Sequence, residues 1–173
     1  QVIVPGDAKQ AEQALEYALK QKGPVYIRLN RNAMPDLPAS DAIGTVCIAS
    51  GSDVTIAANG ITSSFANEAA VLLREEGITA EVLSVPVVKP LDVQILRDSV
   101  AKTGKLLCVE EHVLAGGFSS AISEAFMKEG ISCRFDAIGI EDVFTETGPY
   151  EPLLAKYGIS AENIAERAKK LCK

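Results

Sequence analysis

The 173-residue chain has no tryptophan and only one histidine, and aromatic residues make up 5% of it. No apolar run approaches the roughly 18 residues that a membrane-spanning helix needs, and the first residues lack the pattern of a signal peptide. Basic residues are outnumbered, since 17 Lys and Arg stand against 23 Asp and Glu and the formal net charge is −6. Nucleic acids are bound by basic faces. We therefore expect a cytoplasmic protein that binds neither nucleic acid nor a membrane.

Paired cysteine motifs are also missing. The four cysteines lie far apart and form no C-x-x-C pair, which argues against a zinc site or a redox motif. Three of them fall in apolar, strand-like runs, where cysteine behaves as a small buried hydrophobic residue. We predict four free thiols, in keeping with a reducing compartment. The four are Cys47, Cys108, Cys133 and Cys172.

The first part of the chain predicts one helix, one strand and a linker. The chain opens with Gln1 at what looks like the end of an apolar strand, so we expect a fragment of something longer. Asp7 can cap a helix that Gly23-Pro24 stops, and the strand 25–29 follows. Two prolines and several turn residues then mark a linker, and we place a domain boundary within 32–43. The predicted inward face of the helix is Ala8, Ala11, Leu15, Ala18 and Leu19.

Beyond the linker, apolar strands alternate with helices, a pattern typical of a parallel sheet covered on both faces. The short spacer 51–53 joins the first two strands so tightly that we predict an antiparallel hairpin there. The predicted fold is α/β, a three-layer α/β/α sandwich with a mostly parallel five-stranded sheet and one antiparallel strand from the opening hairpin. We expect strands at 45–50, 54–59, 80–85, 105–111 and 133–140, and helices at 64–76, 90–103, 119–129, 150–157 and 161–171.

The stretch VEEHVLAGGFSS, residues 109–120, is a first candidate site because it holds the only histidine, His112. It begins at the carboxyl end of a predicted parallel strand, where α/β proteins bind ligands. Neighbouring strand residues point to opposite faces, so Glu110 and Glu111 cannot form a carboxylate pair in one site. Gly116-Gly117 could present N–H groups to an anion, but the full G-x-G-x-x-G pattern is absent and favours a plain turn. We favour a structural role for the stretch, as a strand end and loop packed against a neighbouring surface.

Two other stretches leave binding and structural interpretations open. Asn59-Gly60 and the hydroxyl residues 62–64 could bind phosphate at a helix N-terminus, but such hydroxyls are common helix caps, and we favour the cap. Arg31 follows an apolar strand, and arginine suits phosphate or carboxylate recognition. A surface salt bridge would explain it as well, and no spacing decides between the two. Arg28 should lie on the opposite face from Arg31 if the strand stays regular.

Five stretches of the sequence resemble, in order, the C-terminal end of transketolase. The likeness is closest to the split form of that enzyme, whose C-terminal half is a separate subunit. The likeness covers essentially the whole chain. No single stretch would be specific, but all five occur in the same order and at matching positions. They are GPVYIRLNR (23–31), GSDVTIAANG (51–60), VLSVPVVKPLD (82–92), VEEHVLAGGFSSAISE (109–124) and IGIEDVFTETGPYEPLLAKYGISAENI (138–164).

The resemblance implies a function for a complete enzyme. Transketolases use thiamine diphosphate and a divalent metal ion, Mg or Ca, to move two-carbon ketol units between sugar phosphates, with active sites between two subunits. Residues 1–36 would be the tail of the pyrimidine-binding domain, a helix and a strand, and 37–173 the transketolase C-terminal domain. The Gly-Asp-Gly metal motif and the glutamate that activates thiamine are not in this sequence. We therefore expect no catalysis and no bound cofactor in the chain alone, and an N-terminal section as its partner in a homodimer or heterotetramer.

The resemblance singles out Arg31 as the substrate-phosphate residue, because it matches the family arginine that grips the sugar phosphate at the mouth of the active site. Many transketolases have Leu-Ser-Arg at this point, whereas this chain has Leu-Asn-Arg. His112 matches no catalytic histidine of the family, and the resemblance implies dimer contacts for its segment.

Two alternatives stay open. One is a related enzyme, the β subunit of a 2-oxo acid dehydrogenase or deoxyxylulose-phosphate synthase, although the tail TGPYEPLLAKYGISAENI favours transketolase. The other is a non-catalytic module for subunit association or for binding a regulator. In each case residues 1–36 would expose a helix face and a strand edge, so we expect them to dock onto the C-terminal domain or a partner chain.

Overall fold

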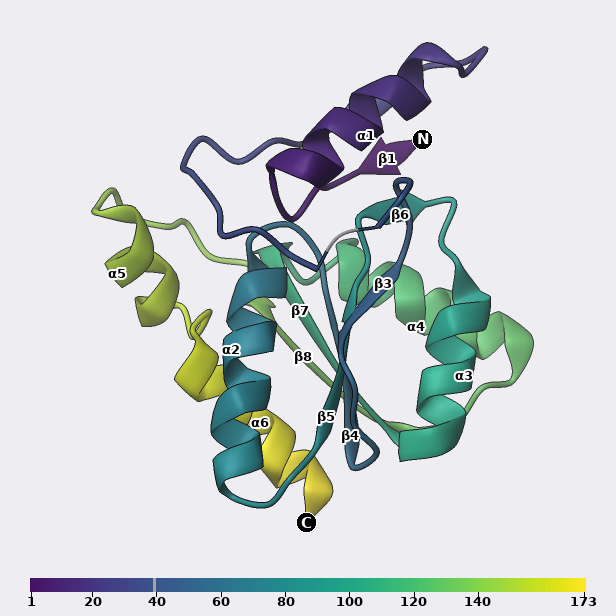
Figure 1. Ribbon diagram of the computed structural model, residues 1–173. Helices are drawn as coiled ribbons and strands as arrows, with labels where there is room; N and C mark the ends of the chain where they lie inside the picture. Colours follow the sequence, from purple (N-terminus) through teal and green to yellow (C-terminus); the bar gives the residue numbers. More distant parts are fainter. Residues whose placement is uncertain (39) are drawn as a thin grey trace.

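The computed structural model describes residues 1–38 and 40–173, which form two sheets and six helices (Figure 1). The larger sheet has the strand order β3-β5-β4-β7-β8, and the smaller sheet has the order β2-β1-β6. The strands are β1 (Val2–Ile3), β2 (Tyr26–Ile27), β3 (Val46–Ala49), β4 (Val54–Ala58), β5 (Ala80–Ser84), β6 (Val87–Lys89), β7 (Lys105–Val113) and β8 (Arg134–Ile140). The helices are α1 (Ala8–Leu19), α2 (Thr62–Glu75), α3 (Val93–Thr103), α4 (Phe118–Glu129), α5 (Tyr150–Lys156) and α6 (Ala161–Cys172).

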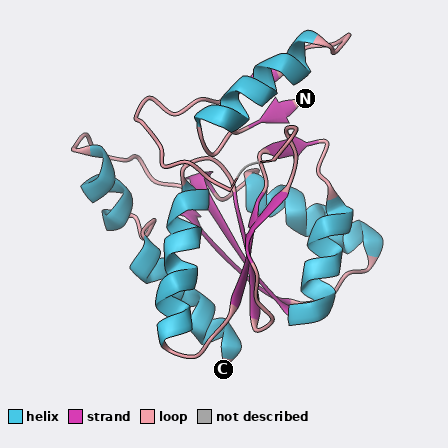
Figure 2. Ribbon diagram, in the orientation of Figure 1, coloured by secondary structure: helices cyan, strands magenta, loops and turns pink. Residues whose placement is uncertain are grey.

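Helices cover both faces of the larger sheet (Figure 2). α2 and α6 share one apolar core with it, through side chains such as Leu73 and Ile164. α3 and α4 share the other, through Leu96 and Ile122. The central strand β4 is buried along its whole length because it lies between these two helix layers. The predicted three-layer α/β/α fold is therefore confirmed. Within the described residues, no helix combines the length and the apolar character needed to cross a membrane.

The opening strand is antiparallel, as predicted, but it does not form the predicted hairpin. β3 pairs with β5, with Cys47 opposite Leu83, and β5 lies between β3 and β4. The turn at Gly51 therefore reverses the chain without pairing its two arms. The backbone of Ala80 runs directly against this turn, since a Cβ on Gly51 would lie 2.3 Å from the Ala80 carbonyl carbon. The prediction that the chain reverses direction at the spacer 51–53 was correct. The prediction that the two strands joined by this spacer pair with each other was wrong, because β5 lies between them.

All four cysteines are free, as predicted. Cys108 is buried in β7, and burial raises the pKa of its thiol well above the ordinary value. Cys47 is exposed, contrary to the expectation that strand cysteines are buried, because β3 is an edge strand.

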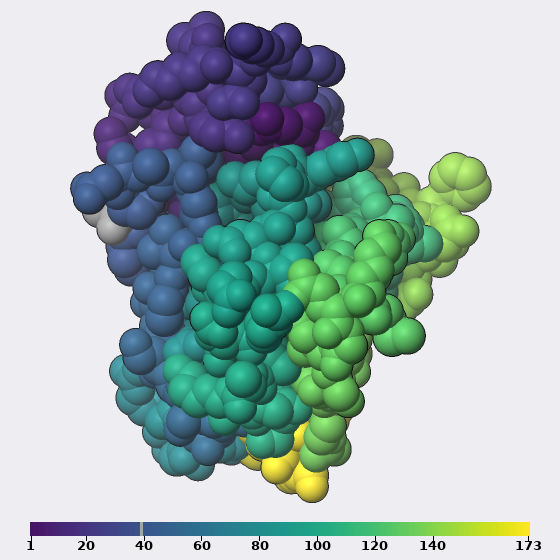
Figure 3. Space-filling model, turned by 90° about the vertical axis from the view of Figure 1, so that its right-hand side faces the viewer, coloured from purple at the N-terminus to yellow at the C-terminus, as the bar shows by residue number. Residues whose placement is uncertain are grey.

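The N-terminal segment, residues 1–37, is seated against one end of the remaining chain, as Figure 3 shows. β1 pairs with β6 in antiparallel fashion, Val4 N donates to Pro86 O at 2.7 Å, and Gly60 N donates to Val4 O at 3.2 Å. The linker is tied in as well, because Leu37 N donates to the Asp7 carboxylate at 2.8 Å. The predicted docking of this segment is confirmed. The predicted boundary region 32–43 includes Ala39, which lies outside the described residues, and its described residues form no helix or strand.

Helix α1 turns the opposite face inward from the one predicted. Asp7 caps it as expected, accepting from Gln10 N at 2.7 Å. Its buried residues include Gln10 and Gln13, whereas Leu15 and Leu19 are 57% and 79% exposed. The prediction of an inward apolar face was wrong because Gln10 and Gln13 face the protein, where they donate to Ser84 Oγ and to the main-chain oxygen of Ser40. An uncovered apolar face therefore remains on α1.

We expect Gly51→Ala to lower the free energy of unfolding by about 1–3 kcal/mol, the usual cost of forcing extra volume into a packed site. The added methyl group would collide with the Ala80 backbone, which cannot move without disturbing β5. Urea denaturation measures the loss. Gly44→Ala is the matched control, because a Cβ there meets no atom within 4 Å, and it should stay within about 0.5 kcal/mol of the parent. Equal losses in both variants would contradict this account of the turn.

Candidate functional site

Arg31 lines a cavity of about 200 Å³ that forms where the N-terminal segment meets the rest of the chain. Arg28, Asn30, Glu111 and Tyr150 line it too, together with Gly60 and Ile61 just before α2. These residues come from stretches far apart in the sequence, and Glu111 lies near the carboxyl end of β7. The cavity thus lies outside the carboxyl ends of parallel strands, where open α/β sheets bind ligands.

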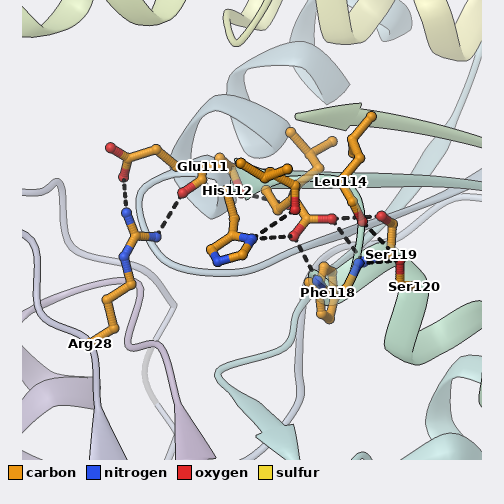
Figure 4. Close-up of polar contacts among 12 residues, drawn as sticks. Arg28, Glu111, His112, Leu114, Phe118, Ser119 and Ser120 are labelled. Carbon is orange, nitrogen blue, oxygen red and sulfur yellow. Dashed lines mark hydrogen bonds and ion pairs between the residues drawn. The ribbon is translucent and has the colours of Figure 1, made fainter. Parts of the chain in front are cut away.

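Arg28 and Arg31 both line this cavity, and the expectation that they lie on opposite faces of a regular strand does not apply to them. The expectation assumed a regular strand, but β2 ends at Ile27 and the chain then leaves the sheet. Arg28 Nη1 donates to the main-chain oxygen of Glu111 at 2.8 Å, and Nη2 lies 3.4 Å from its carboxylate. Figure 4 shows the two side chains reaching toward each other. Arg28 is therefore held by a carboxylate, whereas no carboxylate of the described residues pairs with the exposed Arg31.

The residue between the two arginines is fixed by both atoms of its amide group. Asn30 Nδ2 donates to the Tyr150 hydroxyl at 2.7 Å, and Asn30 Oδ1 accepts from Asn32 N at 2.9 Å. Burial, and then the charge of Glu111, raise the pKa of Tyr150 to about 12, so its phenol stays protonated at neutral pH. Sequence reasoning missed this contact because Asn30 and Tyr150 are 120 residues apart and no local pattern connects them.

Glu110 occupies the N-terminus of α4, the place where Gly116-Gly117 could have bound an anion. Its carboxylate accepts from Phe118 N at 2.6 Å, Ser119 N at 2.9 Å and Ser119 Oγ at 2.6 Å. The glycine permits this approach, because a Cβ on Gly117 would lie 2.2 Å from Glu110 Oε2. The favoured interpretation as a turn is correct, and the chain's own carboxylate is the anion at this helix N-terminus.

His112 is exposed and does not line the cavity of Arg31. Its Nδ1 lies 2.7 Å from the Val113 carbonyl oxygen and 3.9 Å from the Glu110 carboxylate. Both His112 and Glu110 line a second cavity of about 750 Å³, between the smaller sheet and α4, whereas Glu111 lines the first. The two glutamates therefore face different cavities, as strand alternation predicted.

The hydroxyl residues 62–64 neither cap α2 nor lie free to bind phosphate. The N-cap is Ile61, which has no side-chain hydrogen bond to the helix. Thr62 Oγ1 donates to Asn59 O at 2.7 Å and Val109 O at 2.9 Å, and Ser64 Oγ donates to Ile61 O at 2.8 Å. The favoured cap was wrong because the hydroxyls of Thr62 and Ser64 bond to carbonyl oxygens and the hydroxyl of Ser63 lies 3.1 Å from Ser84 Oγ, so none of them serves the helix N–H groups.

Comparison with known proteins assigns the chain to a family. The family described as "Transketolase, C-terminal domain" matches residues 45–164. The chain belongs to this transketolase C-terminal domain family.

Similar transketolase-family proteins include both enzymes and parts of enzymes. The chain is 39% identical to a 1-deoxy-D-xylulose-5-phosphate synthase of Heliobacterium modesticaldum, over 98% of this chain and 27% of that protein. It is 33% identical to one of the subunits of the apulose-4-phosphate transketolase of Phocaeicola vulgatus, over 96% of this chain and 54% of that protein. The chain thus spans about a quarter to about half of these relatives.

Solved transketolases share the fold. A split-gene transketolase, in the form of an inactive beta4 tetramer, superimposes with a TM-score of 0.93 at 37% identity, over 99% of this chain and 57% of that one. A transketolase of Pichia stipitis, at 23% identity and a TM-score of 0.76, shows the fold alone. The predicted likeness to the split form of transketolase is confirmed.

Among the described residues, no group of three or more His, Cys, Asp or Glu side chains is placed to hold a metal ion. A guanidinium such as that of Arg31, which lines the first cavity, is a group that can bind an anion.

We expect Glu110→Gln to lower the free energy of unfolding by about 1.5–3 kcal/mol, the range for hydrogen bonds to a charged group. The amide loses the negative charge and turns an N–H group toward the N–H donors of α4. Thermal or urea denaturation measures the change. Glu124→Gln, on the exposed side of the same helix, removes only a solvent-exposed ion pair with Lys128 and should cost less than about 0.5 kcal/mol. If both variants were equally stable, the carboxylate would not be stabilising the helix N-terminus.

Proposed function

We propose that this chain is the C-terminal section of a thiamine-diphosphate-dependent transketolase, which transfers two-carbon ketol units between sugar phosphates. The observation that carries the proposal is the likeness to a split-gene transketolase over 99% of this chain. The chain alone is inactive and contributes subunit contacts and the substrate-phosphate residue Arg31. The description of that relative as an inactive beta4 tetramer supports the inactivity of an isolated C-terminal section.

Residues 1–36 are the tail of a pyrimidine-binding domain and 37–173 the C-terminal domain. Large exposed apolar side chains support this division, because four of the nine in the described residues fall between residues 15 and 29. An uncovered apolar group of this kind marks an interaction surface. An N-terminal section of the enzyme covers it, within a homodimer or heterotetramer. The four side chains are Leu15, Leu19, Tyr26 and Leu29.

Thiamine diphosphate and a divalent metal ion belong to the N-terminal section. The cofactor supplies carbanion stabilisation, and no residue of this chain takes part in that step. What this chain supplies is a cation at the rim of the active site. Arg31 has no carboxylate partner among the described residues, so its charge is available to a sugar phosphate, whereas Glu111 holds Arg28. The four free thiols are in keeping with a cytoplasmic location.

A second candidate is 1-deoxy-D-xylulose-5-phosphate synthase, which the 39% identity to the Heliobacterium modesticaldum enzyme favours. A phosphate-binding arginine would suit that enzyme equally, because the product given in the enzyme's name, 1-deoxy-D-xylulose 5-phosphate, is also a sugar phosphate. The choice between the two therefore depends on the substrates of the complete enzyme.

We expect the 173-residue chain alone to show no turnover, and its complex with the N-terminal section to convert xylulose 5-phosphate and ribose 5-phosphate. A coupled assay measures product formation. Pyruvate with glyceraldehyde 3-phosphate is the parallel substrate pair, and turnover of that pair alone would support the synthase instead. Turnover by the isolated chain, free of contaminating enzyme, would contradict the proposal.

In the complete enzyme, Arg31→Ala should raise KM for a phosphorylated acceptor about ten- to a hundredfold, as expected for loss of a charge-assisted contact. KM for an unphosphorylated acceptor such as glycolaldehyde should change little. Arg74→Ala is the matched control, because Arg74 lies in the last turn of α2, away from the cavity. An equal effect on both acceptors would count against the phosphate role of Arg31.

A further inference from the structure

We propose that Asn30 and Tyr150 are positioning residues that hold Arg31 in place for the phosphate end of the substrate. The proposal rests on the phosphate role of Arg31 described above. It deepens that role by naming the contacts that fix the arginine, since neither residue need touch the substrate.

The backbone around Arg31 needs such support because it has left the sheet. The last hydrogen bond that ties this stretch to its neighbour strand joins Arg28 N to Ile3 O, at 2.9 Å. Leu29 is exposed beyond that point, and Arg31 is exposed as well. A guanidinium on an exposed stretch without further anchors loses conformational freedom when it binds, and that loss weakens binding.

Asn30 provides two anchors at once. Its Oδ1 accepts from Asn32 N at 2.9 Å, a turn that encloses Arg31 between the two asparagines. Its Nδ2 donates to the Tyr150 hydroxyl at 2.7 Å. The first contact sets the local backbone, and the second ties that backbone to a different part of the fold.

Tyr150 is a firm anchor point. It is the first residue of α5 and packs against the apolar core on the α2 and α6 side of the sheet. Its phenol stays neutral at physiological pH because burial and the nearby Glu111 raise its pKa to about 12. Glu111 in turn is held by Arg28. Two contacts to the body of the protein thus precede Arg31 in the chain, one through Arg28 and one through Asn30.

Two conservative variants separate the two anchors. Tyr150→Phe removes only the hydroxyl. Asn30→Ser keeps a side-chain oxygen that can close the same kind of turn, but that oxygen lies one bond closer to the backbone and loses the reach to Tyr150. Tyr157→Phe is the matched control at the other end of α5, where the hydroxyl makes a long 3.5 Å contact with Glu146 at the surface.

The experiment measures steady-state kinetics of the complete enzyme with ribose 5-phosphate and with glycolaldehyde as acceptors. In Tyr150→Phe and Asn30→Ser, KM for ribose 5-phosphate should rise about two- to tenfold, the range for loss of one neutral hydrogen bond. The value of kcat, the glycolaldehyde kinetics and the melting temperature should stay near those of the parent and of Tyr157→Phe. In an Arg31→Ala background, Tyr150→Phe should add no further loss, because the anchor has nothing left to position.

Other outcomes overturn the proposal in distinguishable ways. If Arg31→Ala discriminates against phosphorylated acceptors but Tyr150→Phe and Asn30→Ser do not, the positioning role fails while the proposed function stands. If the losses from Tyr150→Phe and Arg31→Ala add, or if both acceptors are affected together with a lower melting temperature, Tyr150 supports the fold and not the arginine. If Arg31→Ala has no phosphate-selective effect, the phosphate role and the positioning role fail together.

Discussion

The pairing of β1 with β6 is the contact on which the candidate site depends. Two short strands at the start of the chain have no sheet of their own, and they complete one by hydrogen bonding to a strand from the second part of the chain. This pairing carries the stretch 28–31 to the carboxyl ends of β4 and β7. Without this pairing, Arg28 would not contact Glu111 and Asn30 would not contact Tyr150. The cavity at Arg31 would then not form, because residues from both parts of the chain line it.

The site also depends on the opposite directions in which two neighbouring glutamates of β7, Glu110 and Glu111, point. Glu110 is turned inward and stabilises the start of α4, while Glu111 is turned toward the N-terminal segment and holds Arg28. One carboxylate is thus used to build the domain and the next to join the two parts of the chain. The result is that Arg28 is paired with a carboxylate, whereas no carboxylate of the described residues pairs with Arg31.

Several of the most conspicuous polar residues of the sequence are used within the fold. The hydroxyls of Thr62 and Ser64 donate to carbonyl groups, whereas His112 is exposed and its Nδ1 lies 2.7 Å from the Val113 carbonyl oxygen. Gly117, one of the paired glycines, leaves room for the carboxylate of Glu110, which occupies the place that a phosphate could have taken. In a fold where helices begin beside strand ends, buried polar groups must find partners, and here the chain supplies those partners itself. A functional assignment based on residue type alone would have selected His112.

The α/β class, nearly all of the helices and strands of the main sheet, the Asp7 cap and the free thiols could be predicted from the amino-acid sequence, because they follow from local periodicity, turn residues and cysteine spacing. The opposite directions of Glu110 and Glu111 could be predicted as well, since strand alternation is local. Three features could not be predicted and became visible in the folded chain: β3 pairs with β5, α1 packs through Gln10 and Gln13, and Arg28 and Arg31 line one cavity with Tyr150. Each of the three depends on which surface comes to lie next to a segment, and contacts between residues as far apart as Asn30 and Tyr150 leave no periodic pattern in the sequence.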